Sequence, residues 1–148
     1  MVHDLYQETI LDHSKRPRNF HSMENATRQA DGYNPLCGDQ LRVYLHVRDN
    51  QVQEVSFEGS GCAISKASAS ILTESLKGKT RGEVRKIFDK IHELVTSGEA
   101  SDDLGKLAVL GGVHKFPARV KCAILSWHGL MAALKGQAQP VSTEDEHN

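Results

Sequence analysis

The order of two hydrophobic periodicities most constrains the fold of this chain. Leu41 to Arg48 and Gln51 to Phe57 both alternate apolar and polar residues, and Asp49-Asn50 between them predicts the turn of a β-hairpin. Ala26 to Tyr33 is expected to add a third strand. Helical spacing follows in three segments, Cys62 to Leu76, Thr80 to Thr96 and Pro117 to Leu134. Strands followed by helices predict an α+β domain, with helices packed on one face of a small antiparallel β-sheet.

The two ends of the chain carry different signals. Leu5 to His13 predicts a short amphipathic helix with Asp4 as its N-cap, ended by the basic turn Lys15 to Arg18. From Gly136 to Asn148 the residues are mostly polar, which predicts a disordered tail. We therefore expect one domain over residues 1–135 and a tail over 136–148.

The last predicted helix can be oriented by its apolar stripe. Residues at intervals of four and three form one face directed at the core: Val120, Ile124, Trp127, Met131 and Leu134. Cys122 lies roughly opposite this stripe at 100° per residue, so we expect it to face a surface or a site.

Composition excludes several classes of function. A chain of 148 residues with a formal net charge of −1 fits one ordinary domain and offers no broad basic face for nucleic acid. No apolar run approaches the ~20 residues of a membrane span, and Met1 to Asp4 does not begin a signal peptide, so we expect a cytoplasmic protein without membrane contact. Three cysteines in a reducing compartment favour metal binding or thiol chemistry over disulfides.

Each cysteine stands where a turn meets a strand or helix. Gly38 allows a tight loop from which Cys37 and Asp39 project towards one point, although Asp39 could instead only cap a turn. Cys62 follows a glycine-rich turn and is expected at a helix N-terminus, where the dipole lowers the pKa of a thiol. Arg119 and Lys121 are expected to favour the thiolate of Cys122. For Cys62 the alternative is a small buried residue that packs against the hairpin, and this alternative is weaker for Cys122, which lies off the core stripe.

Taken together, three thiolates and one carboxylate suit tetrahedral Zn(II). A structural zinc site usually contains close pairs such as CxxC, and this sequence has none. Ligands from distant segments predict a site that can open. His114 follows Gly111-Gly112 in a flexible approach to the third cysteine, where it could reach the site or remain a solvated loop residue.

The three cysteine motifs resemble those of the IscU/SufU family of iron-sulfur cluster assembly proteins. The motifs are NPLCGD at 34–39, GSGCAIS at 59–65 and FPARVKCA at 116–123, and the agreement extends from about Leu5 to Leu134. Lys121 stands where the cluster-scaffold branch has a histidine, and the segment from Ala63 to Lys121 is longer than in that branch. Both features resemble the SufU branch and argue against a stable cluster.

This resemblance implies a fold, a ligand set and a partner. The implied fold is the SufE/NifU fold, similar to that of IscU and the NifU N-terminal domain. The implied zinc ligands are Cys37, Asp39, Cys62 and Cys122. The implied partner is a PLP-dependent, SufS-like cysteine desulfurase, from which the protein accepts persulfide sulfur for delivery to a downstream iron-sulfur assembly scaffold.

The expected function is that of a zinc-dependent sulfur acceptor and carrier, with Cys37 as the accepting nucleophile. Whether the chain acts as an enzyme, a sulfurtransferase, is left open. One alternative is a scaffold that binds iron or a [2Fe-2S] cluster through the same cysteines. A second is a binding module in which zinc only stabilises an adaptor surface.

Overall fold

The computed structural model describes residues 2–99, 104–136 and 141–142 of the chain. Its elements follow in the order α1 (Val2–Lys15), β1 (Arg28–Asn34), β2 (Asp39–Arg48), β3 (Gln51–Ser60), α2 (Ala63–Leu76), α3 (Arg81–Ser97), the 3₁₀ helix η1 (Gly105–Lys115), α4 (Pro117–Lys135) and β4 (Val141–Ser142). The predicted α+β class and the predicted hairpin, third strand and three long helices are all confirmed.

The sheet has the strand order β3-β2-β1-β4. The strands β1, β2 and β3 pair antiparallel, and Asp49 and Asn50 turn the hairpin with φ angles of 53° and 64°. Two consecutive positive φ angles match the right-handed twist of the paired strands, which is why Asp and Asn occupy this turn. The short strand β4 lies parallel to β1 within the segment expected to be a disordered tail. Positions 137–140 and 143–148 of that segment lie outside the described residues.

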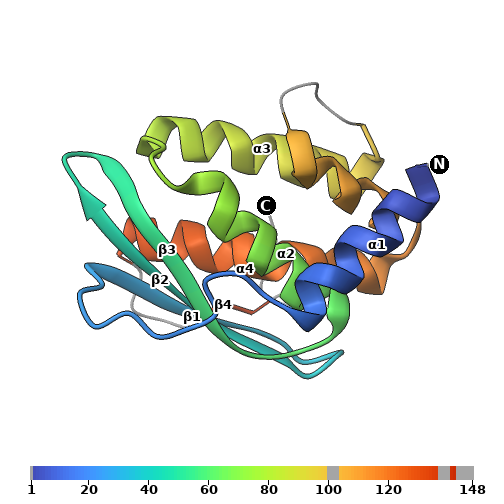
Figure 1. The fold of residues 1–148 in the computed structure, drawn as a ribbon, viewed down its shortest axis with the longest axis horizontal. Helices are drawn as coiled ribbons and strands as arrows, with labels where there is room; N and C mark the ends of the chain where they lie inside the picture. The colour runs from blue at the N-terminus through green and yellow to red at the C-terminus, as the bar shows by residue number, and fades with distance from the viewer. Residues whose placement is uncertain (1, 100–103, 137–140, 143–148) are drawn as a thin grey trace.

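The helices cover one face of the sheet (Figure 1). Both α2 and α4 pack directly on the strands, and α1, α3 and η1 pack against these two helices. The expected stripe of α4 faces the core, with Ile124 and Trp127 fully buried. Ser68 of α2 joins the two central helices, because its hydroxyl donates to the Ala123 carbonyl at 2.6 Å and accepts from Trp127 Nε1 at 3.2 Å. The elements that carry the second and third cysteines are thus fixed to each other.

Two local expectations were wrong. Asp4 is not an N-cap, because α1 already begins at Val2 and Asp4 lies within its first turn. The approach to the third cysteine is not an open loop but the helix η1. Its buried residues recur every three positions, as a 3₁₀ helix requires: Leu107, Leu110 and Val113. Within the described parts of the chain, no helix is both long and apolar enough to span a bilayer.

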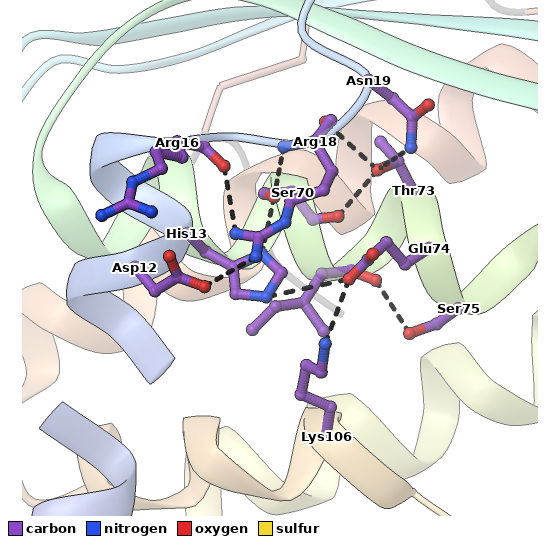
Figure 2. A network of polar contacts seen from close by, with 11 residues as sticks. Asp12, His13, Arg16, Arg18, Asn19, Ser70, Thr73, Glu74, Ser75 and Lys106 are labelled. Carbon is purple, nitrogen blue, oxygen red and sulfur yellow. Dashed lines mark hydrogen bonds and ion pairs between the residues drawn. The ribbon is translucent and has the colours of Figure 1, made fainter. Parts of the chain in front are cut away.

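A polar network connects α1 to α2 (Figure 2). The buried His13 contacts the Ser70 hydroxyl through Nδ1 at 2.7 Å, and its Nε2 lies 3.7 Å from Glu74 Oε1. The same Ser70 hydroxyl accepts the Arg18 backbone N–H at 2.8 Å, and Lys106 of η1 reaches Glu74 at 3.3 Å. Burial lowers the pKa of His13, aided by the positive charge of Arg18, so the folded protein favours neutral imidazole.

Candidate functional site: a thiol and carboxylate cluster

The first cysteine lies on a tight loop between β1 and β2. Gly38 adopts a φ of 75°, as expected for the turn that separates Cys37 from Asp39. Asp39 begins β2 and is completely buried, whereas Cys37 is exposed. The loop thus presents one accessible thiol above a carboxylate that is fixed in the protein.

The loop meets the third cysteine across the fold. The sulfur atoms of Cys37 and Cys122 lie 3.5 Å apart, although 85 positions separate them in sequence. The two sulfurs and a carboxylate oxygen of Asp39 all lie within 4.8 Å of one another. Cys122 is only 3% exposed. It was expected to face a surface or a site, and it faces the cluster of Cys37 and Asp39 rather than solvent.

The second cysteine adjoins this cluster through its backbone. Cys62 is the N-cap of α2, and its sulfur accepts the Ser65 N–H at 3.4 Å. Its own N–H donates to Asp39 Oδ1 at 2.9 Å. A Cβ atom at Gly61 would lie only 2.7 Å from the same Oδ1, so glycine at this position permits the close approach. Asp39 therefore caps a backbone amide, but one in another segment rather than in its own turn.

A buried asparagine completes the site, and the sequence reading did not select it. Asn34 ends β1 with no exposed surface, and its Nδ2 lies 3.4 Å from Asp39 Oδ2 and 3.6 Å from Cys122 Sγ. The signal that could have identified it is the Asn-Pro pair that precedes Cys37, which is typical of a turn closed by an asparagine side chain.

The thiols differ strongly in their protonation. The hydrogen bond from Cys122 lowers the pKa of Cys62 to about 6, and the N–H groups of Ser65 and Ile64 act in the same direction. The reciprocal bond to Cys62 and burial raise the pKa of Cys122, as do its contacts with Asp39 and Cys37. The metal-free cluster therefore keeps a proton on Cys122 and forms its first thiolate at the N-terminus of α2.

The structure corrects the expected origin of these pKa changes. Arg119 and Lys121 were expected to favour the thiolate of Cys122, but the neighbouring thiols and burial dominate and raise its pKa. The guanidinium of Arg119 instead stacks over the exposed Phe116 ring, with 4.7 Å between its Cζ atom and the ring centroid.

His114 is half-buried, and its Nδ1 contacts the Gly111 carbonyl at 2.8 Å. It lines a groove of about 330 Å³ between α3 and α4, together with His92 and Lys121.

The donor atoms suit a thiophilic metal ion. With Zn–S bonds of about 2.3 Å, sulfur ligands of a tetrahedral zinc lie about 3.8 Å apart. The 3.5 Å between the Cys37 and Cys122 sulfurs is close to this spacing. Asp39 can contribute one further oxygen, and the thiolate of Cys62 adjoins the same cluster. The buried Ser65 hydroxyl has no hydrogen-bond partner among the described residues, which leaves a polar atom unsatisfied beside the site.

Comparison with known proteins identifies the family of this chain. The family model described as the NifU-like N terminal domain matches residues 5–123. The zinc-dependent sulfurtransferase SufU of Bacillus subtilis is 44% identical over 131 residues, which cover 85% of this chain and 86% of that protein. The iron-sulfur cluster assembly scaffold protein IscU of Streptococcus pyogenes is 34% identical over 148 residues, covering 99% of this chain and 92% of that protein.

Solved structures give the same assignment. The crystal structure of a putative iron-sulfur cluster assembly scaffold protein for the SUF system, from Fervidobacterium islandicum, aligns with a TM-score of 0.82 and 34% identity over 89% of this chain and 98% of that one. A NifU-like N-terminal protein from Brucella abortus shares the fold, with a TM-score of 0.83 at 22% identity over 92% and 96% of the two chains. The chain belongs to the family of the NifU-like N-terminal domain, which includes IscU and SufU.

Proposed function

We propose that the protein is a zinc-dependent sulfur acceptor and carrier in iron-sulfur cluster assembly. The observation that carries this proposal is the unequal exposure of two neighbouring thiols. Cys37 is exposed on a loop, whereas Cys122, 3.5 Å away, is buried. Such a pair can keep one sulfur in the protein while it offers the other to a partner. The name of the B. subtilis relative, a zinc-dependent sulfurtransferase, supports the same function.

The proposed zinc ligands are Cys37, Asp39, Cys62 and Cys122. Cys37, Asp39 and Cys122 form a compact donor group, and Cys62 adjoins them through the hydrogen bond from its backbone N–H to Asp39. Bound zinc would keep the thiolates deprotonated and protect them from oxidation until a partner docks. Asp39 would be the hardest donor of the four, and both of its oxygens already accept hydrogen bonds within the protein.

Cys37 would accept the sulfur by nucleophilic exchange. Its thiolate attacks the outer sulfur of a cysteine persulfide on the donor, so a new S–S bond forms on Cys37. The S–S bond of the donor breaks at the same time, and its electron pair leaves on the donor cysteine as a thiolate. The persulfide proton moves with the transferred sulfur, and no external oxidant or reductant is required. Exposure selects Cys37 for this role because a buried Cys122 is out of reach of a second protein.

The proposed donor is a PLP-dependent cysteine desulfurase of the SufS type, with the PLP in the partner. The exposed side chains of Leu36 and Phe116 lie next to Cys37 and at the start of α4, and they would contribute apolar surface to docking. The recipient would be a downstream iron-sulfur assembly scaffold. Because the reaction needs reduced thiols, we place it in the cytoplasm.

A second candidate function is a scaffold that holds iron or a [2Fe-2S] cluster on the same residues. The IscU relative from S. pyogenes, which aligns with nearly the whole chain, favours this alternative. The donor group of two sulfurs and a carboxylate oxygen, with a third sulfur adjoining, would also accept iron. Anaerobic purification followed by iron, sulfide and zinc analysis separates the two functions, since the carrier contains about one zinc per chain and no acid-labile sulfide.

The direct test is to locate the transferred sulfur. The zinc-loaded protein is incubated with a cysteine desulfurase and L-cysteine, and its peptides are analysed by mass spectrometry without reductant. We expect one additional sulfur on Cys37. The Cys37→Ser variant should lose transfer. The matched control is Ser60→Cys, which adds an exposed thiol at the end of β3, and the peptide that contains this new thiol should carry no additional sulfur. Persulfide mainly on Cys62 or Cys122, or full transfer by Cys37→Ser, would contradict the proposal.

A further inference from the structure

The loop that carries Cys37 is attached to one residue, Asn34. The Asn34 carbonyl accepts the N–H of Cys37 at 3.3 Å and that of Gly38 at 2.8 Å. Its side-chain Oδ1 accepts the N–H of Leu36 at 3.2 Å. Pro35 has no N–H, so Asn34 accepts every backbone donor of residues 35–38. The backbone N–H groups of this loop therefore all bond to Asn34, one to its side chain and two to its main-chain carbonyl.

The other half of the Asn34 amide faces the thiol cluster. Leu36 can only donate from its backbone N–H, so the oxygen of the amide must point at Leu36 and the NH₂ group must point the other way. There Nδ2 lies 3.4 Å from Asp39 Oδ2 and 3.6 Å from Cys122 Sγ. Both are the acceptors that an NH₂ group requires. The orientation of the amide is thus fixed from both sides.

We propose that Asn34 is the positioning residue that determines how readily Cys37 separates from Cys122 and Asp39. The oxygen of its amide holds the loop at Leu36, and the NH₂ group contacts the two buried groups that the loop must leave. The role in sulfur transfer rests on the proposed function, but the restraint on the loop does not.

The surrounding residues show where the loop can move. A Cβ atom at Gly38 would meet no atom within 4 Å, so the end of the loop next to Asp39 has open space. Asp39 and Cys122 are buried and are held by β2 and α4. Motion that exposes Cys37 further therefore breaks the bonds from Leu36, Cys37 and Gly38 to Asn34, while the bonds from Nδ2 remain. Partners that orient metal ligands in this way typically change metal affinity by about 10–100-fold when they are removed.

Two substitutions separate the two ends of the amide. Asn34→Ala removes both, whereas Asn34→Ser keeps a hydroxyl that can accept the Leu36 N–H in a turn but has no NH₂ group for Asp39 and Cys122. Gln29→Ala removes an exposed amide from the same strand and serves as the matched control. Unfolding of the metal-free proteins by heat identifies any general loss of stability.

The loop restraint is measured without metal. Amide hydrogen exchange of peptides that cover residues 35–38 should be about tenfold faster in Asn34→Ala than in wild type, and close to wild type in Asn34→Ser and Gln29→Ala. In the zinc-loaded proteins, capture of zinc by a chelator and alkylation of Cys37 should both be about tenfold faster in Asn34→Ala. In the cobalt-substituted proteins, the sulfur-to-cobalt charge-transfer bands should shift in both Asn34 variants, because both lose the Nδ2 contact with Cys122.

The outcomes distinguish failure of the positioning role of Asn34 from failure of the proposed function. Loop exchange and zinc capture within twofold of wild type in Asn34→Ala would overturn the positioning role. If Asn34→Ala does not fold, Asn34→Ser decides, and unshifted cobalt bands in that variant would overturn it. Faster exchange and faster Cys37 alkylation in Asn34→Ala support the positioning role even when wild type takes no sulfur on Cys37, a result that would refute only the proposed function.

Discussion

Asp39 Oδ1 accepts a hydrogen bond from the backbone N–H of Cys62 at 2.9 Å. This bond joins the end of the Cys37 loop to the N-terminus of α2, so two of the three cysteine segments are connected by protein atoms alone. Asp39 is buried, and its other oxygen faces the Asn34 amide. The carboxylate therefore has a structural role in addition to its proposed role as a metal ligand.

Replacement of this carboxylate should destabilise the fold even without metal. Asp39→Ala leaves the Cys62 N–H without its acceptor and removes one of the acceptors of the Asn34 NH₂ group, and a buried unsatisfied donor costs about 1–3 kcal/mol. We expect a loss of this size in urea unfolding of the metal-free protein. The control is Asp31→Ala, which removes a half-exposed partner of Arg42 and should cost less than about 1 kcal/mol. Equal effects of the two substitutions would show that the bonds of Asp39 contribute little.

The approach of Cys62 to Asp39 depends on the absence of a side chain at Gly61. A methyl group there would lie 2.7 Å from Asp39 Oδ1 and 3.2 Å from Ser65 Oγ, so Gly61→Ala must displace the carboxylate or the start of α2. We expect zinc affinity to fall by about tenfold or more, measured by competition with a chelator. Gly82→Ala is the control, because the nearest atom to its Cβ would be 4.0 Å away. Unchanged affinity in Gly61→Ala would place Cys62 and Asp39 outside the metal site.

The pKa of Cys62 can be read from its reactivity. In the metal-free protein, alkylation of Cys62 should increase with a midpoint at about pH 6, because Cys122 and the N–H groups of α2 stabilise its thiolate. Cys122→Ala removes the largest of these contributions, so the midpoint should rise towards the ordinary cysteine value of about 8.5. Peptide mass spectrometry after brief iodoacetamide treatment gives both curves. A midpoint that does not change in Cys122→Ala would show that the helix terminus alone lowers this pKa.

His13 should make the stability of the fold decrease in acid. Its pKa in the folded protein lies below the ordinary value of 6.5, so the unfolded chain binds the proton first as pH falls. The groups that face it are Arg18 and Lys106, which lower this pKa, and Glu74 and Asp12, which raise it. The contribution of His13 to the free energy of unfolding is therefore fully present above about pH 6.5 and is lost as the pH falls below that value.

Urea unfolding with a chelator present tests this expectation. Between about pH 7.5 and about pH 5.5, the midpoint should fall less in His13→Gln than in wild type. His21→Gln, which removes an exposed histidine, should retain the decline of wild type. Since all three proteins contain Cys62, its titration in the same range cancels in the comparison. Parallel declines in wild type and His13→Gln would contradict the expectation.

The local signals in the sequence were sufficient to predict most of the helices and strands. Alternating residues in β2 and β3, the Thr80 capping box with Glu83 and Pro117 at the start of α4 all act within a few positions of chain, and each element appears where it was expected. The helix η1 was missed because its three-residue period lies within a glycine-containing stretch that resembles a loop. Strand β4 was missed because a two-residue strand has no periodicity of its own.

The sequence by itself determined the positions of the cysteines at element junctions, and with them the expected N-cap thiol of Cys62 and the left-handed Gly38. Only the tertiary structure decided which thiol is exposed and which retains its proton. The packing of α4 against the sheet and α2 buries Cys122 beside Cys62, and the hydrogen bond between these two thiols is the largest cause of both pKa shifts. Exposure and charge interaction depend on distances between segments far apart in sequence, and local composition does not encode those distances.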